Sequence, residues 1–177
     1  MKLIIASDIH GSLSAAQALQ EAVAREGADR VLLLGDLLYH GPRNTLPADY
    51  SPKDVIPILN GMKDSLLCVR GNCDSEVDQM VLEFPIQADY AWIWAGKYNL
   101  FATHGHLYDP VTYPLRANEL FISGHTHIAG HWEENGRIRL NPGSMGIPKG
   151  DTPAGYMTWD GETFRWHHLD GTVYDTL

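Results

Sequence analysis

Lys2-Leu3-Ile4-Ile5-Ala6-Ser7-Asp8-Ile9-His10 decides the fold, because a short apolar run ends there abruptly in an acid and a histidine. The segment Lys2–Ala6 has the length and apolar content of a buried strand. In open α/β sheets, ligands gather beyond the carboxyl ends of the strands. Asp8 and His10 therefore stand where such a sheet would place functional side chains.

Two further apolar runs in the first 75 residues follow the same plan. Val31–Leu34 is closed by Gly35-Asp36, and Leu66–Val69 ends in Arg70-Gly71-Asn72. Helix-forming residues fill Ser14–Val23, between the first two runs. Strands that alternate with helices predict a largely parallel sheet.

The second half of the chain changes to short strand patterns, separated by turn signals such as Glu134-Asn135-Gly136 and Asp160-Gly161. The predicted strands are Ala91–Ala95, Asn99–Thr103, Leu120–Ser123, Gly130–Glu133, Arg137–Leu140, Gly155–Trp159 and Thr163–His167. A βαβαβ unit followed by a β-rich half fits two sheets packed face to face. We therefore predict an α/β (α+β) fold, a four-layer αββα sandwich of two mixed β-sheets flanked by helices, as a single domain over residues 1–177.

Composition and charge exclude several classes of protein. The 177 residues hold 22 Asp and Glu against 13 Lys and Arg, a formal net charge of −9. So acidic a surface argues against a protein that coats nucleic acid or an anionic membrane. No apolar run approaches the ~20 residues of a membrane-spanning helix, and the opening run is too short for a signal peptide. The two cysteines, Cys68 and Cys73, fit neither a disulfide framework nor a thiolate zinc site. We expect a cytoplasmic protein.

Side chains able to bind a metal follow five of the predicted strands. They are Asp8, His10, Asp36, Asn72, His104, His125 and His127. Imidazole and oxygen donors without a thiolate suit a divalent transition metal such as Mn, Fe, Co, Ni or Zn. Seven donors exceed what one ion takes from protein, which indicates two ions that share a carboxylate. Two divalent ions beside only two acids leave a positive site suited to phosphate, and water on such ions has a pKa near ~7.

The ordered set Asp-x-His, Gly-Asp, Gly-Asn-Cys-Asp, His and Gly-His-x-His resembles the pattern of the calcineurin-like metallophosphoesterases. Longer matching stretches make the resemblance closest to the small bacterial YfcE-type phosphodiesterases. These stretches are Ser7–Ser12, His40–Asn44, Arg70–Met80, Thr103–Leu107 and Asn141–Ser144. The resemblance implies a two-sheet sandwich flanked by helices, and a phosphodiesterase activity.

The resemblance also divides the seven side chains between two ions. One ion is held by Asp8, His10 and His127, and the other by Asn72, His104 and His125, with Asp36 as the bridge. The family implies Mn²⁺ as the metal, and Zn²⁺, Ni²⁺, Fe²⁺ and Co²⁺ are the alternatives.

The sequence offers several candidates for the proton donor to the leaving group, because Cys73 stands where most relatives have a histidine. An unperturbed thiol, with a pKa near ~8.5, donates a proton poorly near neutral pH. Cys73, His40 and His106 are the candidate catalytic residues, and Cys73 is alternatively a small buried residue. Without that histidine as a partner, Asp74 is expected to cap the following turn. The candidate substrate-binding residues are Asn72, His40 and Arg43.

The function predicted is hydrolysis of small phosphodiesters by a metal-bridging hydroxide, without a covalent enzyme intermediate. One alternative is a non-catalytic scaffold on the same fold, like the scaffold subunit of retromer. Another is a nuclease, although the negative charge counts against a long nucleic acid as substrate. We expect no membrane partner, and homo-oligomerisation stays open.

Overall fold

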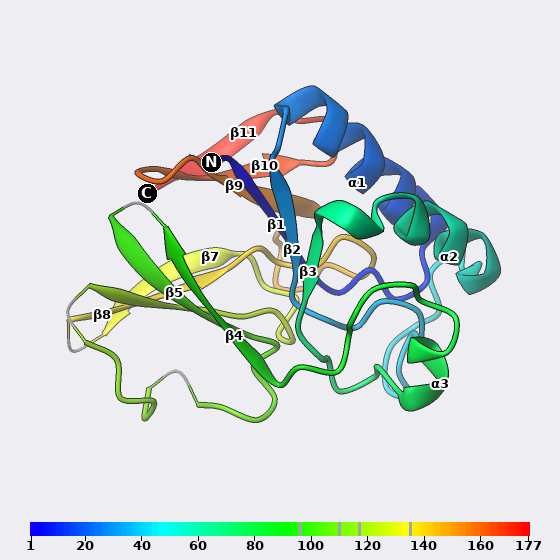
Figure 1. Cartoon of the computed structure of the whole chain (residues 1–177), viewed down its shortest axis with the longest axis horizontal. Helices are drawn as coiled ribbons and strands as arrows, with labels where there is room; N and C mark the ends of the chain where they lie inside the picture. The colour runs from blue at the N-terminus through cyan, green and yellow to red at the C-terminus, as the bar shows by residue number, and fades with distance from the viewer. Residues whose placement is uncertain (96, 110, 117, 135) are drawn as a thin grey trace.

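The computed structural model describes residues 1–95, 97–109, 111–116, 118–134 and 136–177. Two mixed β-sheets pack face to face, with helices along one outer side (Figure 1). The first sheet has the strand order β11-β10-β9-β1-β2-β3. Its strands are β1 Leu3–Ala6, β2 Arg30–Leu33, β3 Leu66–Cys68, β9 Gly155–Trp159, β10 Phe164–His168 and β11 Val173–Thr176. Because β1, β2 and β3 pair in parallel, their carboxyl ends open at the same edge.

The second sheet has the strand order β4-β5-β6-β8-β7. Its strands are β4 Tyr90–Ala95, β5 Tyr98–Thr103, β6 Glu119–Ile122, β7 Gly130–Glu134 and β8 Arg137–Asn141. The central strands β5, β6 and β8 pair in parallel, and the edge strands β4 and β7 are antiparallel to their neighbours. The loops that follow β5 and β6 therefore leave this sheet at one edge.

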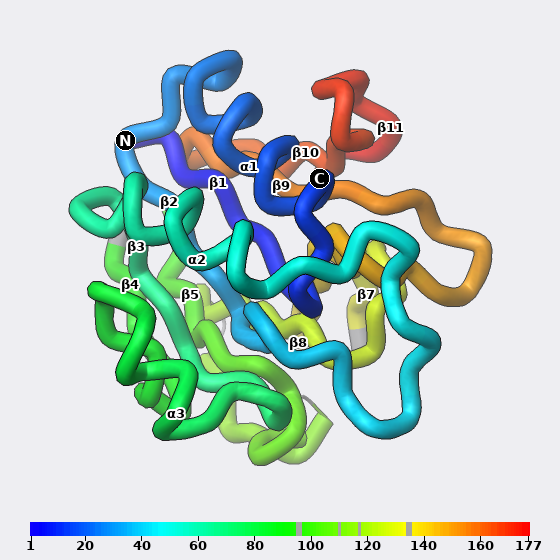
Figure 2. Tube along the Cα trace, turned by 90° about the vertical axis from the view of Figure 1, so that its right-hand side faces the viewer, coloured from blue at the N-terminus to red at the C-terminus, as the bar shows by residue number. Residues whose placement is uncertain are grey.

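The helices are α1 Leu13–Glu26, α2 Pro52–Gly61, the 3-10 turn η1 Lys63–Ser65 and α3 Glu76–Gln79. The hydroxyl of Ser12 accepts the backbone N–H of Ala15 and caps the start of α1. Gly27 ends α1 in a left-handed conformation, with φ of 59°. Figure 2 shows α1 and α2 lying across the face of β1 and β2.

The alternation of side chains along β1 builds two cores. Ile4 and Ala6 face the helices, whereas Leu3 and Ile5 face the second sheet. Each of these side chains is almost fully buried, and burial of one large aliphatic side chain contributes roughly 1.5–3 kcal/mol. The strand that carries Asp8 at its end is thus held from both faces.

The outer face of the second sheet is covered by aromatic side chains in the described part of the chain. Phe101 of β5 stacks on Tyr113 at 4.0 Å between ring centroids, and Tyr108 meets Phe101 edge-on at 5.5 Å. Trp94 of β4 stays 71% exposed. Aromatic residues from the loop after β5 therefore cover this face of the sheet.

The predicted sandwich of two mixed β-sheets with helices is confirmed, and both ends of each predicted strand agree within one residue. The predicted helix layer on the second sheet is not found among the described residues, because aromatic side chains of the loop after β5 cover that face instead. Strand β11 and helix α3 were not predicted, because neither contains a buried residue and neither therefore shows an apolar pattern. Asn135, in the predicted turn between β7 and β8, lies outside the described residues. None of the helices described has the length and apolarity needed to span a membrane.

Candidate metal centre

Five of the seven candidate ligands adopt a left-handed backbone conformation. The φ angles are 56° at Asp8, 51° at His10, 57° at Asp36, 66° at His125 and 62° at His127. Among the described non-glycine residues, only Asp151 shares this conformation. Such a backbone costs on the order of 1–3 kcal/mol per residue and clusters where function requires a fixed geometry. The loops at the strand ends are thus bent sharply to aim these side chains.

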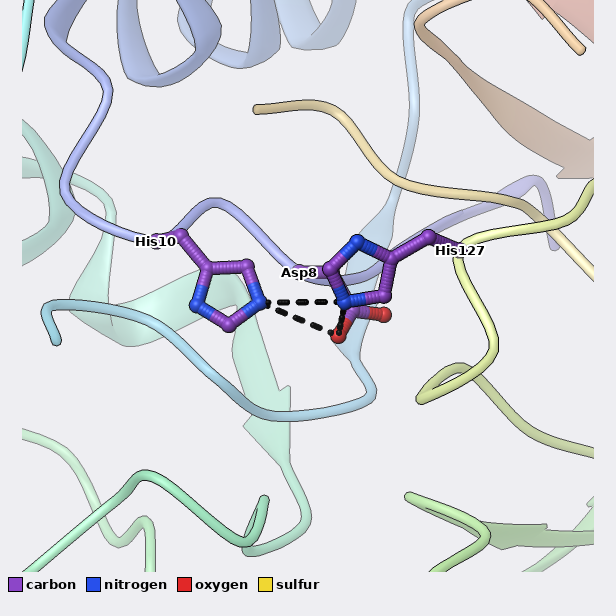
Figure 3. A group of neighbouring side chains, drawn as sticks. All are labelled: Asp8, His10 and His127. Atoms are coloured by element: carbon purple, nitrogen blue, oxygen red, sulfur yellow. Dashed lines mark hydrogen bonds and ion pairs between the residues drawn. The ribbon is translucent and has the colours of Figure 1, made fainter. Parts of the chain in front are cut away.

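Asp8, His10 and His127 form a buried triangle (Figure 3). Asp8 Oδ1 lies 3.5 Å from Nε2 of His10 and 3.3 Å from Nε2 of His127. The two Nε2 atoms are 3.2 Å apart. Asp8 and His10 follow β1, whereas His127 follows β6, so the triangle joins the two sheets.

Main-chain carbonyls set the tautomers of both histidines. Nδ1 of His10 donates to the carbonyl of Tyr39 at 2.7 Å, and Nδ1 of His127 donates to the carbonyl of Ile147 at 2.5 Å. Each neutral imidazole then presents an Nε2 lone pair to the other and to Asp8 Oδ1, a buried oxygen without a hydrogen-bond partner in the described chain. Three electron-pair donors this close repel one another unless a cation lies among them. The triangle therefore fits a divalent metal ion.

Asp36 lies between this triangle and a second group of side chains. Its Oδ2 is 3.6 Å from Nε2 of His10 and 3.5 Å from Nε2 of His104. Its Oδ1 accepts the backbone N–H of Cys73 at 2.8 Å. A Cβ atom on Gly71 would fall 2.1 Å from Asp36 Oδ1, so only glycine allows this close approach.

Asn72, His104 and His125 form the second group. Nδ1 of His104 donates to the carbonyl of Leu34 at 2.6 Å, which leaves its Nε2 lone pair facing inward. That Nε2 lies 3.0 Å from Asn72 Oδ1 and 3.2 Å from Nδ1 of His125. Asn72 is exposed and His125 half-buried, so this group faces solvent more than the triangle does.

The electrostatics of the site also call for positive charge. Burial disfavours the imidazolium form of His104, but the carboxylates of Asp36 and Asp8 outweigh burial and raise its pKa to about 9. Burial likewise opposes the charge on His10, and Asp8 and Tyr39 still raise its pKa. Without a metal the site would hold protons in its place, so metal binding releases protons.

Asp74 anchors the loops that carry Asp36 and Asn72. Its Oδ2 accepts the backbone N–H groups of Asp36 and Gly71, both at 2.8 Å. Its Oδ1 accepts the N–H of Leu37 at 2.9 Å. The expectation that Asp74 caps the following turn was wrong. The side chains of Ser75 and Asp78 cap α3 instead.

Asn141 and Ser144 hold two ligand loops in place. The amide of Asn141 donates to the carbonyl of Gly124 at 2.8 Å, next to His125. The hydroxyl of Ser144 donates to the carbonyl of Asp8 at 2.7 Å. This turn after β8 thus ties the loop after β1 to the loop after β6.

A cavity of about 810 Å³ opens over the two groups. Beside Asp36, Asn72, Cys73, His125 and His127, its walls include Tyr39, Arg43, Asn44 and Lys149. Lys149 Nζ donates to Asn44 Oδ1 at 2.9 Å, across 105 residues of sequence. Sequence reasoning missed Lys149, because only the fold brings it beside the segment that contains Arg43.

The other candidate residues occupy different surroundings. His40 does not line this cavity; its ring meets those of Tyr39 and Tyr50 edge-on, at 4.7 and 5.2 Å between centroids. The ring of His106 lies 5.3 Å from that of His104, and burial lowers its pKa. Burial and the nearby carboxylate of Asp36 raise the pKa of the Cys73 thiol to about 12.

The fold and the site together define a class, the metal-dependent phosphoesterases built on a two-sheet sandwich. A family model described as the calcineurin-like phosphoesterase superfamily domain matches residues 1–163. The chain belongs to the calcineurin-like phosphoesterase superfamily.

Named relatives agree with this assignment. The chain is 47% identical to the phosphodiesterase YfcE of Escherichia coli K12 over 163 residues, which is 92% of this chain and 89% of that protein. It matches the solved structure of YfcE, a phosphoesterase from E. coli, with a TM-score of 0.95 at 44% identity, over 100% of this chain and 98% of that one. A Bacillus subtilis protein named as a probable metallophosphoesterase, YsnB, is 28% identical over 100% of this chain and 96% of its own length.

Proposed function

We propose that this protein is a metal-dependent phosphodiesterase that hydrolyses small phosphodiesters within one domain spanning residues 1–177. The observation that carries the proposal is the orphaned Oδ1 of Asp8, which faces two inward imidazole lone pairs at the strand ends. The named activity of the relative that is 47% identical supports the diester as substrate.

The seven side chains divide into two sets with one shared residue. One ion would be held by Asp8, His10 and His127, the other by Asn72, His104 and His125, with Asp36 between them. Mn²⁺ is the ion proposed, since the donors are oxygen and imidazole, and Zn²⁺, Ni²⁺, Fe²⁺ and Co²⁺ are the alternatives. Bound in this way, a metal pair supplies an acidified water and positive charge for a phosphate.

The protein's own side chains would orient the substrate. The amide of Asn72 is exposed to the cavity, where it can donate to a phosphate oxygen. Arg43 and Lys149 add two cations to the cavity wall. The named activity of the relative that is 47% identical, rather than the charge of the cavity, supports a diester over a monoester.

Release of the leaving group would proceed without a strong protein acid. The Cys73 thiol, with a pKa of about 12, holds its proton tightly. His40 and His106 are both absent from the described walls of the cavity. We therefore expect good leaving groups to be strongly preferred.

Neither alternative function is favoured. A scaffold does not require seven ligand-competent side chains that converge on two adjoining positions, and here all seven do so. A nuclease for long nucleic acid needs a cationic track, whereas the chain has a formal net charge of −9. A cytoplasmic location is part of the proposal and rests on the sequence.

The test is metal analysis of the purified protein combined with hydrolysis of bis(p-nitrophenyl) phosphate. EDTA should abolish hydrolysis, and Mn²⁺ should restore it. His127→Ala should lose both activity and metal, whereas His131→Ala, an exposed histidine on β7, should keep both. Full activity in metal-free protein would contradict the proposal.

A further inference from the structure

An apolar groove of about 380 Å³ adjoins the metal cavity. It runs between the segment that leads into α2 and the segment around α3. Its walls include Tyr39, Tyr50, Ile56, Cys73, Val77 and Val81. No part of the proposed reaction so far uses this groove.

The groove is continuous with the metal cavity. Tyr39, Cys73 and Ser75 line both spaces. The main chain of Tyr39 is also fixed to the site, because its carbonyl accepts Nδ1 of His10 at 2.7 Å. Cys73, with its short side chain, lies in the walls of both spaces.

The walls of the groove are unusually apolar for a surface next to a charged site. Val77 is 69% exposed, and Val81 and Tyr39 are exposed at 43% and 42%. Lys53 and Asp78 are the charged residues among its described walls, one of each sign. Exposed apolar side chains that adjoin a polar site are typical of ligand-binding clefts.

The charges favour different parts of a substrate in the two spaces. Arg43 and Lys149 lie in the walls of the metal cavity, where a phosphate would bind. In the groove, the carboxylate of Asp78 offsets Lys53, so a second phosphate gains no net attraction there. An uncharged, apolar group gains most from these walls because it covers exposed valine and tyrosine surface.

We propose that the groove binds one organic ester group of the phosphodiester, an uncharged aromatic or aliphatic substituent, while the phosphate lies in the metal cavity. This inference rests on the proposed function and names the chemistry of the substrate that the site selects. The geometry places the substituent past Cys73, between Tyr39 and Val77.

The test is calorimetric binding of phenylphosphonate and methylphosphonate to the metal-loaded protein, at a pH where both are dianions. Neither compound is hydrolysed, so the measurement needs no turnover. Phenylphosphonate should bind about tenfold more tightly than methylphosphonate, because its ring covers roughly 60 Å² of apolar surface in the groove.

Two groove variants and one matched control sharpen the test. Val77→Asp and Val81→Asp should each reduce the ratio of the methylphosphonate and phenylphosphonate dissociation constants to about twofold or less. In each variant a charged side chain replaces part of the apolar wall. Met80→Asp adds the same charge at the end of α3 but outside the groove, and should keep the preference. Asp at position 77 lies in the first turn of α3, where an acid is compatible with the helix.

The outcomes separate the two proposals. The groove proposal is wrong, and the metal site stands, if methylphosphonate binds as tightly as phenylphosphonate. It is also wrong if both groove variants still bind phenylphosphonate about tenfold more tightly than methylphosphonate. If neither phosphonate binds to metal-loaded protein, the proposed phosphate site itself fails, and the groove proposal fails with it.

Discussion

The two groups of candidate ligands differ in burial and charge. The closed trio, Asp8, His10 and His127, is at most 2% exposed and contains a carboxylate of its own. The open trio, Asn72, His104 and His125, has only neutral donors, and Asn72 is exposed. Both trios reach the shared carboxylate of Asp36.

This difference indicates that the two metal positions have different roles. Buried, rigid donors with a negative charge hold a cation tightly. The open trio has no carboxylate of its own and includes the exposed Asn72, so it holds an ion less tightly and leaves it accessible to a substrate. We therefore expect the closed trio to retain its ion and the open trio to exchange its ion and contact the phosphate.

Asp36→Asn should have the largest effect, because it removes the charge that both trios share. We expect hydrolysis of an aryl diester to fall by roughly a thousandfold or more, with weaker metal binding at both positions. The measurement is kcat together with metal content at several Mn²⁺ concentrations. A variant with two ions bound and activity within about tenfold of the wild type would refute the shared role of Asp36.

Asp74→Asn should have a smaller effect, and mainly on the open trio. Both oxygens of the Asp74 carboxylate accept backbone N–H groups of the loops that carry Asp36 and Asn72. An asparagine replaces one of these acceptors with an NH₂ group, which cannot accept a hydrogen bond. Loss of such supporting contacts typically costs about 10–100-fold in activity or metal affinity. Asp160→Asn is the control and should change activity little, because this carboxylate accepts backbone N–H groups of Glu162 and Thr163 in the turn between β9 and β10. Equal losses in the two variants would show that Asp74 has no special role in the site.

Cys73 variants should have the smallest effect on aryl diesters. Cys73→Ser should change their turnover by less than about threefold, since neither residue attacks phosphorus in this mechanism. Cys73→His should narrow the gap between good and poor leaving groups, provided that the imidazole reaches the leaving oxygen. The measurement is the rate plotted against the pKa of the leaving group.

The same plot can contradict this account of leaving-group release. The wild type should show a steep slope, because no strong acid protonates the departing oxygen. If the wild-type slope is shallow and becomes steep in His40→Ala or His106→Ala, that histidine is the acid, and the account given for Cys73 is wrong.

The strand ends were predictable from sequence, and the supports around them were not. Asp8, Asp36 and His104 each follow an apolar run, so the pattern of strand and polar end locates them. Asp74 was misread, because its carboxylate binds main-chain groups of Asp36 and Leu37 rather than a nearby turn. Local patterns do not report contacts between loops that are distant along the chain.

The cavity walls illustrate the same limit. Lys149 meets Asn44 only because the loops before α2 and after β8 converge over the site. The groove beside Cys73 likewise joins residues of α2 to residues of α3. The motif resemblance locates the candidate ligands and the segment around Arg43. It does not report that Lys149 meets Asn44, or that residues of α2 and α3 line one groove.

The central claim, two ions joined by Asp36 with the closed trio filled first, is tested most directly by electron paramagnetic resonance during a Mn²⁺ titration. The first equivalent should give the signal of an isolated Mn²⁺ ion and little hydrolysis. The second should give the signal of a spin-coupled pair, as expected for bridged ions about 3.5–4 Å apart, together with full activity. Asp36→Asn should lose the coupled signal. Full activity at one equivalent, or two bound ions that never couple, would contradict the account.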